Sequence, residues 1–365
     1  MYGRVLFASQ EQKMNLTSYG WTDFLGAQFN DYSSPGLKPA RVVRSDRGEF
    51  QLIGADGIFR AQTAGILDSS GEPAPIATGD WVAVDRSQDT AVIRAILPRK
   101  SAMTRRRAGA AERAQVVAAN VDFVLVVDGL DRGPNQRRIE RGVALAYGGG
   151  ATPIVILSKA DLCKDREHTS MLVEEAAPFV ETFFISATEG DGLEGLSAHL
   201  APGSTSVLIG PSGVGKSTLA NALSGEGHLA AGPVRAGDAK GRHTTTRSEL
   251  ILLPSGACMI DTPGVRELGL WLDTEAVDAA FADIEGLSET CRFGDCNHSG
   301  EPGCAVVEAV AVGELPASRL ASYQKLLREA EIHEIRHDAS KARLSKNRER
   351  NFAKICRAEQ KRKNR

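Results

Sequence analysis

The segment Gly210-Pro211-Ser212-Gly213-Val214-Gly215-Lys216-Ser217-Thr218 decides the fold of this 365-residue chain. It fits the pattern G-x-x-x-x-G-K-[ST], follows the strand-like run Ser206–Ile209 and continues into a helical pattern that begins at Lys216. This is the context that a phosphate-binding loop requires, because its glycines let backbone N–H groups converge on phosphate oxygens. We expect the nine residues to bind a nucleoside triphosphate, with Lys216 reaching the β- and γ-phosphates and Ser217 binding Mg²⁺.

Four further apolar runs predict strands of the same sheet, and helical patterns separate them. The five predicted strands are Val121–Val127, Pro153–Leu157, Phe183–Ile185, Ser206–Ile209 and Ala257–Ile260, and the helical patterns are Asn135–Tyr147, Leu193–Leu200 and Ser217–Leu223. Their alternation predicts an α/β domain with a buried parallel sheet. Because ligands of such sheets bind beyond the carboxyl ends of the strands, residues directly after each run are candidate site residues.

Short polar motifs follow three of the other predicted strands. They are Ser158-Lys159-Ala160-Asp161, Ser186-Ala187 and Asp261-Thr262-Pro263-Gly264. The Asp161 carboxylate can accept hydrogen bonds from guanine N1–H and the N2 amine, a donor pair that adenine lacks, so it predicts GTP rather than ATP. We expect residues 158–161 to bind the nucleotide, with the Lys159 stem packed on the base and backbone N–H groups of Ser186-Ala187 near guanine O6.

Two segments are expected to sense the γ-phosphate. The Gly264 N–H can reach that phosphate, and Asp261 can hold Mg²⁺ through water. A threonine of the polar segment Gly241-Arg242-His243-Thr244-Thr245-Thr246-Arg247 should complete the Mg²⁺ shell, Thr246 being favoured and Thr245 next. Contacts of this kind order switch segments with GTP and release them after hydrolysis.

The order of the motifs along the chain is unusual. The guanine-reading motifs at 158–161 and 186–187 precede the phosphate loop, whereas a GTPase usually places the phosphate loop first. The same sheet forms when the old termini are joined and the chain is reopened elsewhere, because the termini of a domain often lie close together. We infer a circularly permuted nucleotide-binding domain.

A cysteine cluster lies beyond this domain. Cys291-x4-Cys296-x-His298-x5-Cys304 offers three thiolates and one imidazole, a full set for closed tetrahedral Zn²⁺. Because a filled coordination shell leaves no position for water, a structural zinc ion is favoured over a catalytic one. The alternative is a group of buried free cysteines with an incidental histidine.

The residues before the nucleotide-binding domain are rich in short strand patterns. Arg41–Val43, Gly48–Ile53, Ile58–Ala61, Trp81–Val84 and Thr90–Ile96 predict a small β-barrel, which composition alone does not assign to the oligonucleotide-binding type. Before it, residues 1–38 carry Tyr19, Trp21, Phe24 and Phe29, and we expect a short helix packed on the barrel. The basic residues Arg99, Lys100, Arg105, Arg106 and Arg107 follow it, as an RNA contact or a solvated linker.

Charge is unevenly distributed along the chain. Residues 341–365 hold eleven Lys or Arg and two Glu, a net charge of +9 in a chain whose net charge is −2. A basic tail on an acidic body predicts an anionic macromolecular partner, unless it is only a solvated helix end. The sequence contains no run of about 18 apolar residues and no secretion pattern at its start, so we expect a cytoplasmic monomer without membrane contact.

These motifs in this order resemble the circularly permuted, ribosome small-subunit-dependent GTPases (RsgA, also called YjeQ or YloQ) over residues 40–340. Thr78-Gly79-Asp80-Trp81-Val82 belongs to the resemblance and favours an oligonucleotide-binding (OB-like) barrel. The resemblance implies a multidomain α/β protein with an OB-like barrel (39–104), a circularly permuted GTPase domain (105–272) and a zinc-binding helical domain (273–340). The N-terminal extension (1–38) and the basic tail (341–365) flank these domains. It also implies GTP hydrolysis stimulated by the small ribosomal subunit, rRNA binding and a role in late subunit maturation.

Two positions bear on the chemistry that the resemblance implies. Ser158 stands where the family usually has Asn, so a shorter side chain must support the guanine-binding loop. Val265 stands where many GTPases place the Gln that orients water, so unaided hydrolysis is expected to be slow. The resemblance makes His243 the expected catalytic residue, although a polar loop can also carry a histidine without a role.

Two other functions remain open at this stage. A non-catalytic RNA-binding module that senses GTP is compatible with Val265. A nucleotide kinase would use the same phosphate loop, but it would leave Asp161 and Ser186-Ala187 without a purpose. GTP turnover measured with and without small ribosomal subunits distinguishes the three.

Overall fold

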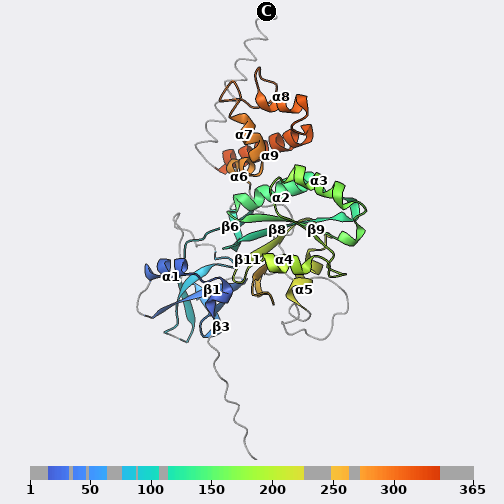
Figure 1. Cartoon of the computed structure of the whole chain (residues 1–365). Coiled ribbons are helices and arrows are strands. Elements are labelled where there is room, and N and C mark those ends of the chain that lie inside the picture. The colour runs from blue at the N-terminus through green and yellow to red at the C-terminus, as the bar shows by residue number, and fades with distance from the viewer. Residues whose placement is uncertain are drawn as a thin grey trace, which may run out of the picture. The chain divides into compact units, whose positions relative to one another are not determined.

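The structure is a computed structural model that describes residues 15–32, 36–46, 49–63, 76–87, 89–106, 114–225, 248–262 and 272–337 (Figure 1). The chain divides into two compact units. The first comprises residues 1–174 and 178–271, and the second comprises residues 175–177 and 272–365. Among the described residues, no helix is both long and apolar enough to span a membrane.

A parallel sheet forms one half of the first unit and confirms the five predicted strands. These are β8 (Phe123–Gly129), β9 (Thr152–Ser158), β10 (Thr182–Ile185), β11 (Thr205–Ile209) and β13 (Cys258–Asp261), in the spatial order β10-β9-β8-β11-β13. One strand beside this sheet was not predicted: β12 (Glu249–Leu252) lies antiparallel along β13.

Helices cover both faces of the parallel sheet. Figure 1 shows α2 (Gln136–Gly148) and α3 (Arg166–Ala176) on one face, and α4 (Leu193–His199) and α5 (Lys216–Ser224) on the other. The core beneath α4 and α5 joins Leu125, Ile154 and Leu208 of the strands to Leu196 and Leu219 of the helices. Burial on both faces explains why these strands read as continuous apolar runs in the sequence.

The other half of the first unit is a closed five-stranded barrel. Its strands are β1 (Leu37–Asp46), β2 (Glu49–Gly54), β3 (Gly57–Thr63), β4 (Trp81–Asp85) and β5 (Ala91–Ile96), in the order β1-β2-β3-β5-β4 with β4 pairing back to β1. The predicted barrel is thus confirmed, with the strand number of an OB-like fold. Strand β1 also pairs with β12 at Arg44 and Glu249, so barrel and parallel sheet are continuous.

The N-terminal segment packs on the outside of the barrel. It comprises a 3₁₀ turn (η1, Leu16–Tyr19) and the helix α1 (Asp23–Asn30), whose N-terminus is capped by the Thr22 hydroxyl. Trp21 meets the buried Trp81 of β4 edge-on, with their ring centroids 4.8 Å apart. The prediction of a short helix held to the barrel by aromatic side chains is confirmed for the described residues.

One buried arginine connects the N-terminal segment, the barrel and the parallel sheet. The Arg41 side chain of β1 is 1% exposed. Its Nε donates to Gly79 O at 3.2 Å, its Nη1 donates to Tyr19 O, and its Nη2 donates to Thr205 Oγ1 at 2.9 Å and Asn120 O at 3.4 Å. A buried guanidinium needs such acceptors, because burial without them is costly.

Nearby carboxylates and an aromatic ring also interact with the Arg41 guanidinium. Burial lowers the pKa of the Arg41 guanidinium, and the negative charges of Asp122 and Asp80 counteract that effect. The guanidinium also lies over the Trp81 ring, 5.4 Å from its centroid. Arg41 therefore stays compensated although it is removed from water.

The segment Thr78-Gly79-Asp80 brings the barrel against the parallel sheet. Thr78 Oγ1 donates to Ser248 O at 3.2 Å, next to β12. Gly79 has a φ of +95°, and a Cβ at this position would lie 2.1 Å from Ala119 O. Only glycine allows this approach of the two backbones.

The basic stretch after the barrel proves to be largely structural. Arg99 makes a bidentate ion pair with the fully buried Asp80, at 2.7 and 2.8 Å. Lys100 pairs with Asp122 at 2.5 Å. Arg99 thus joins the residue before β4 to the end of β5, and Lys100 joins the barrel to the residue before β8, so both cations have carboxylate partners within the fold.

The residues after Lys100 form a two-stranded sheet that the sequence analysis did not predict. Strand β6 (Ala102–Arg106) pairs antiparallel with β7 (Ala114–Ala119). Arg105 Nη2 donates to Gln115 Oε1 at 3.2 Å across the pair. Arg107 lies outside the described residues.

The second unit is helical. It contains α6 (Thr274–Ala280), α7 (Ala282–Ser288), α8 (Ala305–Val312) and α9 (Ala317–His337). Arg319 of α9 makes a bidentate ion pair with Asp283, at 2.5 and 2.6 Å, and lies over the Phe281 ring. The helix predicted from about Ser318 is confirmed as far as His337. The basic tail at 341–365 lies outside the described residues.

We predict that Arg41→Met destabilises the protein by about 3 kcal/mol, because four buried acceptors lose their donor. Urea unfolding followed by tryptophan fluorescence measures the change. Arg94→Met is the matched control, since the Arg94–Asp85 ion pair lies at the barrel surface, where such pairs contribute about 0–1 kcal/mol. Equal losses of stability in the two variants would contradict the role assigned to Arg41.

Candidate nucleotide and metal sites

The phosphate loop has the geometry that its sequence predicts. It connects the end of β11 to α5, whose first residue is Lys216. Gly210, Gly213 and Gly215 all have positive φ, and a Cβ on Gly210 would lie 2.3 Å from Val127 O. Glycine is therefore required for the loop to pass close to β8 before α5 begins. The N-terminus of α5 favours binding of an anion.

The functional side chains of the loop lie at the start of α5. Lys216 is 8% exposed, and its Nζ donates to Gly210 O at 2.7 Å and Pro211 O at 2.6 Å. Ser217 is half-buried, and Thr218 and Ser212 are exposed. The ammonium group is thus held inside the loop, where it can meet phosphate oxygens.

The guanine-reading motifs meet at the carboxyl edge of the parallel sheet. Asp161 lies in a 3₁₀ turn after β9 (η3, Ala160–Leu162), and Ser186 directly follows β10. The Ser186 hydroxyl donates to Asp161 Oδ1 at 2.6 Å. Since the two motifs lie 25 positions apart in sequence, the fold brings them together and orients the carboxylate. Ala160 is buried and Ala187 is half-buried beside them.

Ser158 connects the guanine-reading motif to the phosphate loop. Its hydroxyl is buried, lying 2.5 Å from Val214 O and 3.2 Å from Asp128 O. Although serine is shorter than asparagine, the Ser158 hydroxyl still links the two loops. It has one proton to donate, which the two carbonyl oxygens share.

Asp131 belongs to this edge, and the sequence analysis missed it. It lies in the 3₁₀ turn after β8 (η2, Leu130–Arg132), and its carboxylate pairs with Lys159 Nζ at 3.1 Å. Lys159 has a φ of +56°, which turns the chain from β9 into the guanine-reading turn. Its position in the sequence could have indicated it, because Asp131 follows the one predicted strand to which no motif was assigned.

A second carboxylate, Asp128, lies near the end of β8 itself. Asp128 is 1% exposed and accepts from Arg138 Nη2 at 2.7 Å and from the Asn135 N–H at 2.6 Å. Burial raises the pKa of the Asp128 carboxyl, although these hydrogen bonds and the Arg138 charge oppose that change. Asp128 thereby ties the start of α2 to the end of β8.

Asp261 closes the site on the side of β13. It is the last residue of that strand, which pairs parallel with β11 up to Val207 and Ile260. Strand β13 therefore ends beside β11, the strand that leads into the phosphate loop. The Asp261 carboxylate and the Ser217 hydroxyl are hard oxygen donors, of the kind that suits Mg²⁺. His243, Thr245, Thr246 and Gly264 lie outside the described residues.

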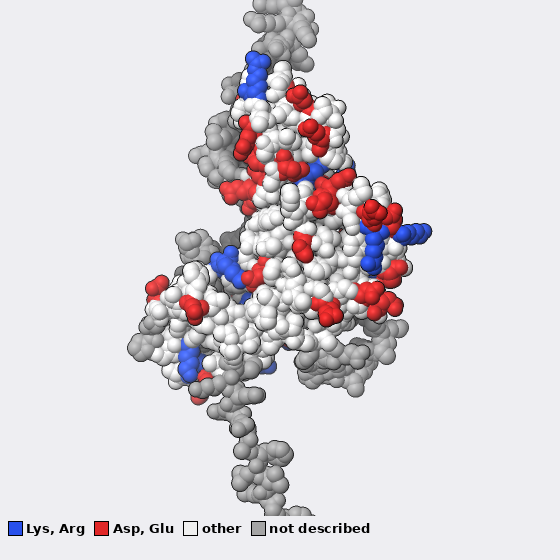
Figure 2. Space-filling view, in the orientation of Figure 1, with Lys and Arg blue, Asp and Glu red and all other residues white. Residues whose placement is uncertain are grey.

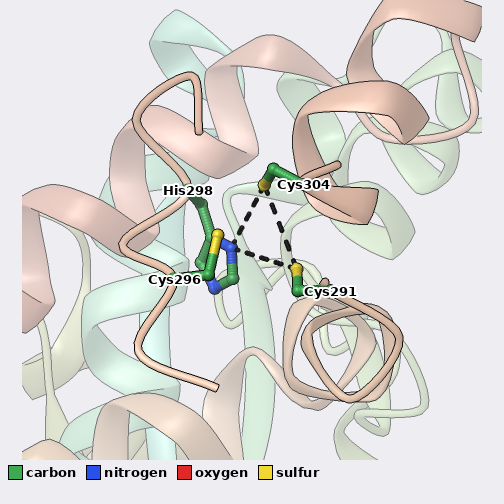
Figure 3. Close-up of side chains that lie close together, drawn as sticks. All are labelled: Cys291, Cys296, His298 and Cys304. Atoms are coloured by element: carbon green, nitrogen blue, oxygen red, sulfur yellow. Dashed lines mark hydrogen bonds between the residues drawn. The ribbon is translucent and has the colours of Figure 1, made fainter. Parts of the chain in front are cut away.

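The second unit gathers the cysteine cluster into one group. The ligand atoms of Cys291, Cys296, His298 and Cys304 all lie within 4.8 Å of one another (Figure 3). Cys291 Sγ lies 4.0 Å from Cys304 Sγ, and His298 Nδ1 lies 3.7 and 3.4 Å from these two sulfurs. Tetrahedral Zn²⁺ with Zn–S bonds of about 2.3 Å sets sulfurs about 3.8 Å apart, so the donor set fits that ion.

Backbone geometry holds the ligands in place. Cys304 caps the N-terminus of α8, and its Sγ accepts from the Val307 N–H at 3.4 Å. His298 has a φ of +55° and is buried, and its carbonyl accepts from Gln324 Nε2 at 2.7 Å. The Glu301 carboxylate accepts from the backbone between the ligands, including the Ser299 N–H at 2.7 Å.

Comparison with protein families identifies the chain. The RsgA GTPase model matches residues 96–271. A relative from Streptomyces coelicolor, named small ribosomal subunit biogenesis GTPase RsgA, is 45% identical over 326 residues, which are 88% of each chain. The chain belongs to the RsgA GTPase family. It is therefore a GTP hydrolase.

Other relatives and solved structures agree with this assignment. The protein of the same name from Opitutus terrae is 42% identical over 92% of this chain and 95% of its own. YjeQ from Thermotoga maritima has a TM-score of 0.61 at 26% identity, over 80% of this chain and 98% of its own. YloQ, described as a circularly permuted GTPase, has a TM-score of 0.59 at 24% identity, over 81% and 96%. This GTPase therefore has the same fold as these two structures, with its strands in the permuted order.

A second family model, ABC transporter, matches residues 193–361. This stretch includes the phosphate loop, which many classes of nucleotide-binding protein have in common. The guanine-reading motifs at 158–161 and 186–187 lie outside it.

We predict that Ser158→Ala weakens GDP binding about fivefold, because losing the bond to Val214 O costs about 1 kcal/mol. Titration with a fluorescent GDP analogue measures the affinity. Ser204→Ala is the matched control: the Ser204 hydroxyl also donates to a carbonyl, Ala201 O at 2.6 Å, but lies away from the nucleotide loops. An unchanged affinity in Ser158→Ala would exclude the link between the two loops.

We predict that Cys304→Ser weakens metal binding by at least about 100-fold and loosens the second unit, because a structural metal supplies folding free energy. Metal stoichiometry by mass spectrometry and protease sensitivity of residues 272–337 are the two measurements. Cys163→Ser, in the first unit, should change neither. Retention of one tightly bound metal in Cys304→Ser would contradict the assigned ligand set.

Proposed function

We propose that this GTPase acts in the biogenesis of the small ribosomal subunit and hydrolyses GTP when bound to that subunit. The observation that carries the proposal is the 45% identity, over 88% of both chains, to a relative named for this role. The guanine-reading edge built by Asp161 and Ser186 supports GTP as the substrate. It also argues against a nucleotide kinase, which has no need for that edge.

The proposed roles follow the positions of the described side chains. Lys216 binds the β- and γ-phosphates, Ser217 and Asp261 hold Mg²⁺, and Asp161 accepts from guanine N1–H and N2. Mg²⁺ held there would neutralise charge on the phosphates. Gly264, with Thr246 or Thr245, senses the γ-phosphate, and His243 serves the attacking water. These last four residues are proposed from their place in the sequence, outside the described part of the chain.

Two metal ions of different kinds are proposed. Zn²⁺ is proposed for the Cys3His group because thiolate and imidazole ligands at this spacing suit it. Its four protein ligands leave no position for water, so the ion stabilises the second unit and does not act on substrate. Mg²⁺ enters with GTP.

The contact with rRNA is proposed for the basic parts of the chain. Figure 2 shows Asp and Glu side chains over much of the face in view, and acidic surface repels RNA. The net charge of +9 at 341–365 is the strongest attraction that the sequence offers to RNA phosphates. We further propose a cytoplasmic protein that works as a monomer without membrane contact.

The experiment is GTP turnover with and without purified small ribosomal subunits. We expect slow release of phosphate from the free protein and a rise of at least about 100-fold with subunits, since an added group that completes the site has effects of this order. His243→Ala should lose the stimulated rate and keep its affinity for GTP.

Each component of the proposal can fail separately. Turnover without any response to subunits would contradict the ribosomal role and leave the GTPase intact. Subunit binding without turnover would favour a GTP-sensing module. A stimulated rate that survives in His243→Ala would remove His243 from the reaction.

A further inference from the structure

An ion pair at the carboxyl edge of the parallel sheet involves a residue that lies outside all the sequence motifs. Asp131 belongs to η2, and Lys159 directly precedes η3, the turn that carries Asp161. The two turns contact each other, and Lys159 Nζ donates to Asp131 Oδ1 at 3.1 Å. The hydrogen bond from Lys159 holds the pKa of the Asp131 carboxyl below its ordinary value, so this group is a carboxylate at neutral pH.

The Asp131 carboxylate lies where three loops approach one another. Gly129 is the last residue of β8, and a Cβ at this position would lie 2.8 Å from Asp131 Oδ1. The same Cβ would lie 3.7 Å from Val214 Cα of the phosphate loop and 3.8 Å from Ser158 Oγ. Asp131 is therefore beside the contact between the phosphate loop and the guanine-reading motif.

The ion pair remains accessible from solvent, as a group that meets a ligand must be. The Lys159 side chain is 32% exposed and the Asp131 side chain is 40% exposed. Lys159 also has a φ of +56°, a left-handed conformation that is unfavourable for a residue with a Cβ. The fold thus fixes both the backbone and the ammonium group of Lys159.

A lysine side chain that is free in solution loses much rotamer freedom when a ligand packs against its stem. An ion pair within the protein removes part of that loss in advance, so it raises affinity without a new contact to the ligand. The first residue of the motif gives limited support of its own, because the Ser158 hydroxyl has one proton for two carbonyl oxygens. A second link to the motif therefore matters in this chain.

We propose that Asp131 is a positioning residue for the guanine nucleotide, whose carboxylate holds Lys159 so that the aliphatic stem can pack on the face of the base. The inference rests on the proposed nucleotide contacts of Lys159 and Asp161. Asp131 acts through Lys159 and not on the ligand. Because the stem meets the face of the ring and not its edge, Asp131 sets how tightly a purine binds and leaves the choice of guanine to Asp161.

The test is a double-mutant cycle on the full chain, measured by titration with a fluorescent GDP analogue. We expect Asp131→Ala to weaken GDP binding about threefold, as for the loss of one partly exposed ion pair. Lys159→Met keeps an unbranched stem and removes the ammonium group. In the Lys159→Met background, Asp131→Ala should therefore change the affinity no further. An unchanged affinity in Asp131→Ala alone, or the same loss in both backgrounds, would overturn the proposal.

Two further measurements separate positioning of Lys159 from a general distortion of the site. Asp131→Ala should weaken GDP and inosine diphosphate by the same factor, because both present the same ring face and differ only in the N2 amine. In GTP turnover, KM should rise by that factor with kcat unchanged, since the contact with the base is equal in the ground and transition states. A greater loss for GDP than for inosine diphosphate, or a fall in kcat, would overturn the positioning role.

Asp56→Ala is the matched control. Asp56 Oδ2 pairs with Lys38 Nζ at 3.2 Å, 47% of the Asp56 side chain is exposed, and the residue lies between β2 and β3 of the barrel. Its loss should leave the affinity for GDP unchanged. Equal effects of Asp56→Ala and Asp131→Ala would mean that any lost negative charge alters binding, and would overturn the proposal.

Asp161→Asn tests the guanine site itself in the same titration. A loss of GDP affinity in Asp161→Asn without one in Asp131→Ala would refute only the positioning role. An affinity for GDP that neither substitution changes would contradict the guanine site as well, and with it the basis of the inference.

Discussion

The fold of the first unit depends on the buried guanidinium of Arg41. A charge removed from water must find acceptors, and Arg41 finds them on Tyr19, Gly79, Asn120 and Thr205. These four residues belong to the N-terminal segment, the barrel, the link after β7 and the parallel sheet. Their separate folding would leave the charge uncompensated, so these parts assemble together.

The nucleotide site depends on a second constraint, the shared edge of a parallel sheet. Four loops end there, and short polar contacts join them: Ser158 with Val214, Ser186 with Asp161, and Lys159 with Asp131. Permutation of the chain leaves this edge unchanged, because strand order in space and not in sequence decides which loops meet. Permutation does change the path of the chain beyond the site, since the chain leaves β13 at Asp261 and continues to the unit that holds the Cys3His group.

Strong local signals made much of the fold predictable. Strands buried on both faces appear as apolar runs, and β8, β9, β10, β11 and β13 were all predicted. The four candidate metal ligands were found from thiol and imidazole spacing over fourteen residues of continuous chain, which leaves little freedom to separate them. By contrast β12 and the β6–β7 pair are short or polar and gain stability only from neighbouring strands. Propensity alone therefore did not reveal them.

The sequence by itself determined the phosphate loop, the candidate guanine-binding aspartate, the candidate metal ligands and the permuted order, because each rests on residue types at fixed local spacing. Only the tertiary structure decided what distant side chains do for one another. Arg99 and Lys100 look like an RNA-binding stretch in sequence, yet carboxylates from elsewhere in the chain pair with them. In the sequence, Ser158 shows only that an asparagine amide is missing. In the folded chain its hydroxyl oxygen lies 2.5 Å from Val214 O, because the fold brings the two loops together. Pairing across long sequence separation is a property of the folded chain, which no local pattern encodes.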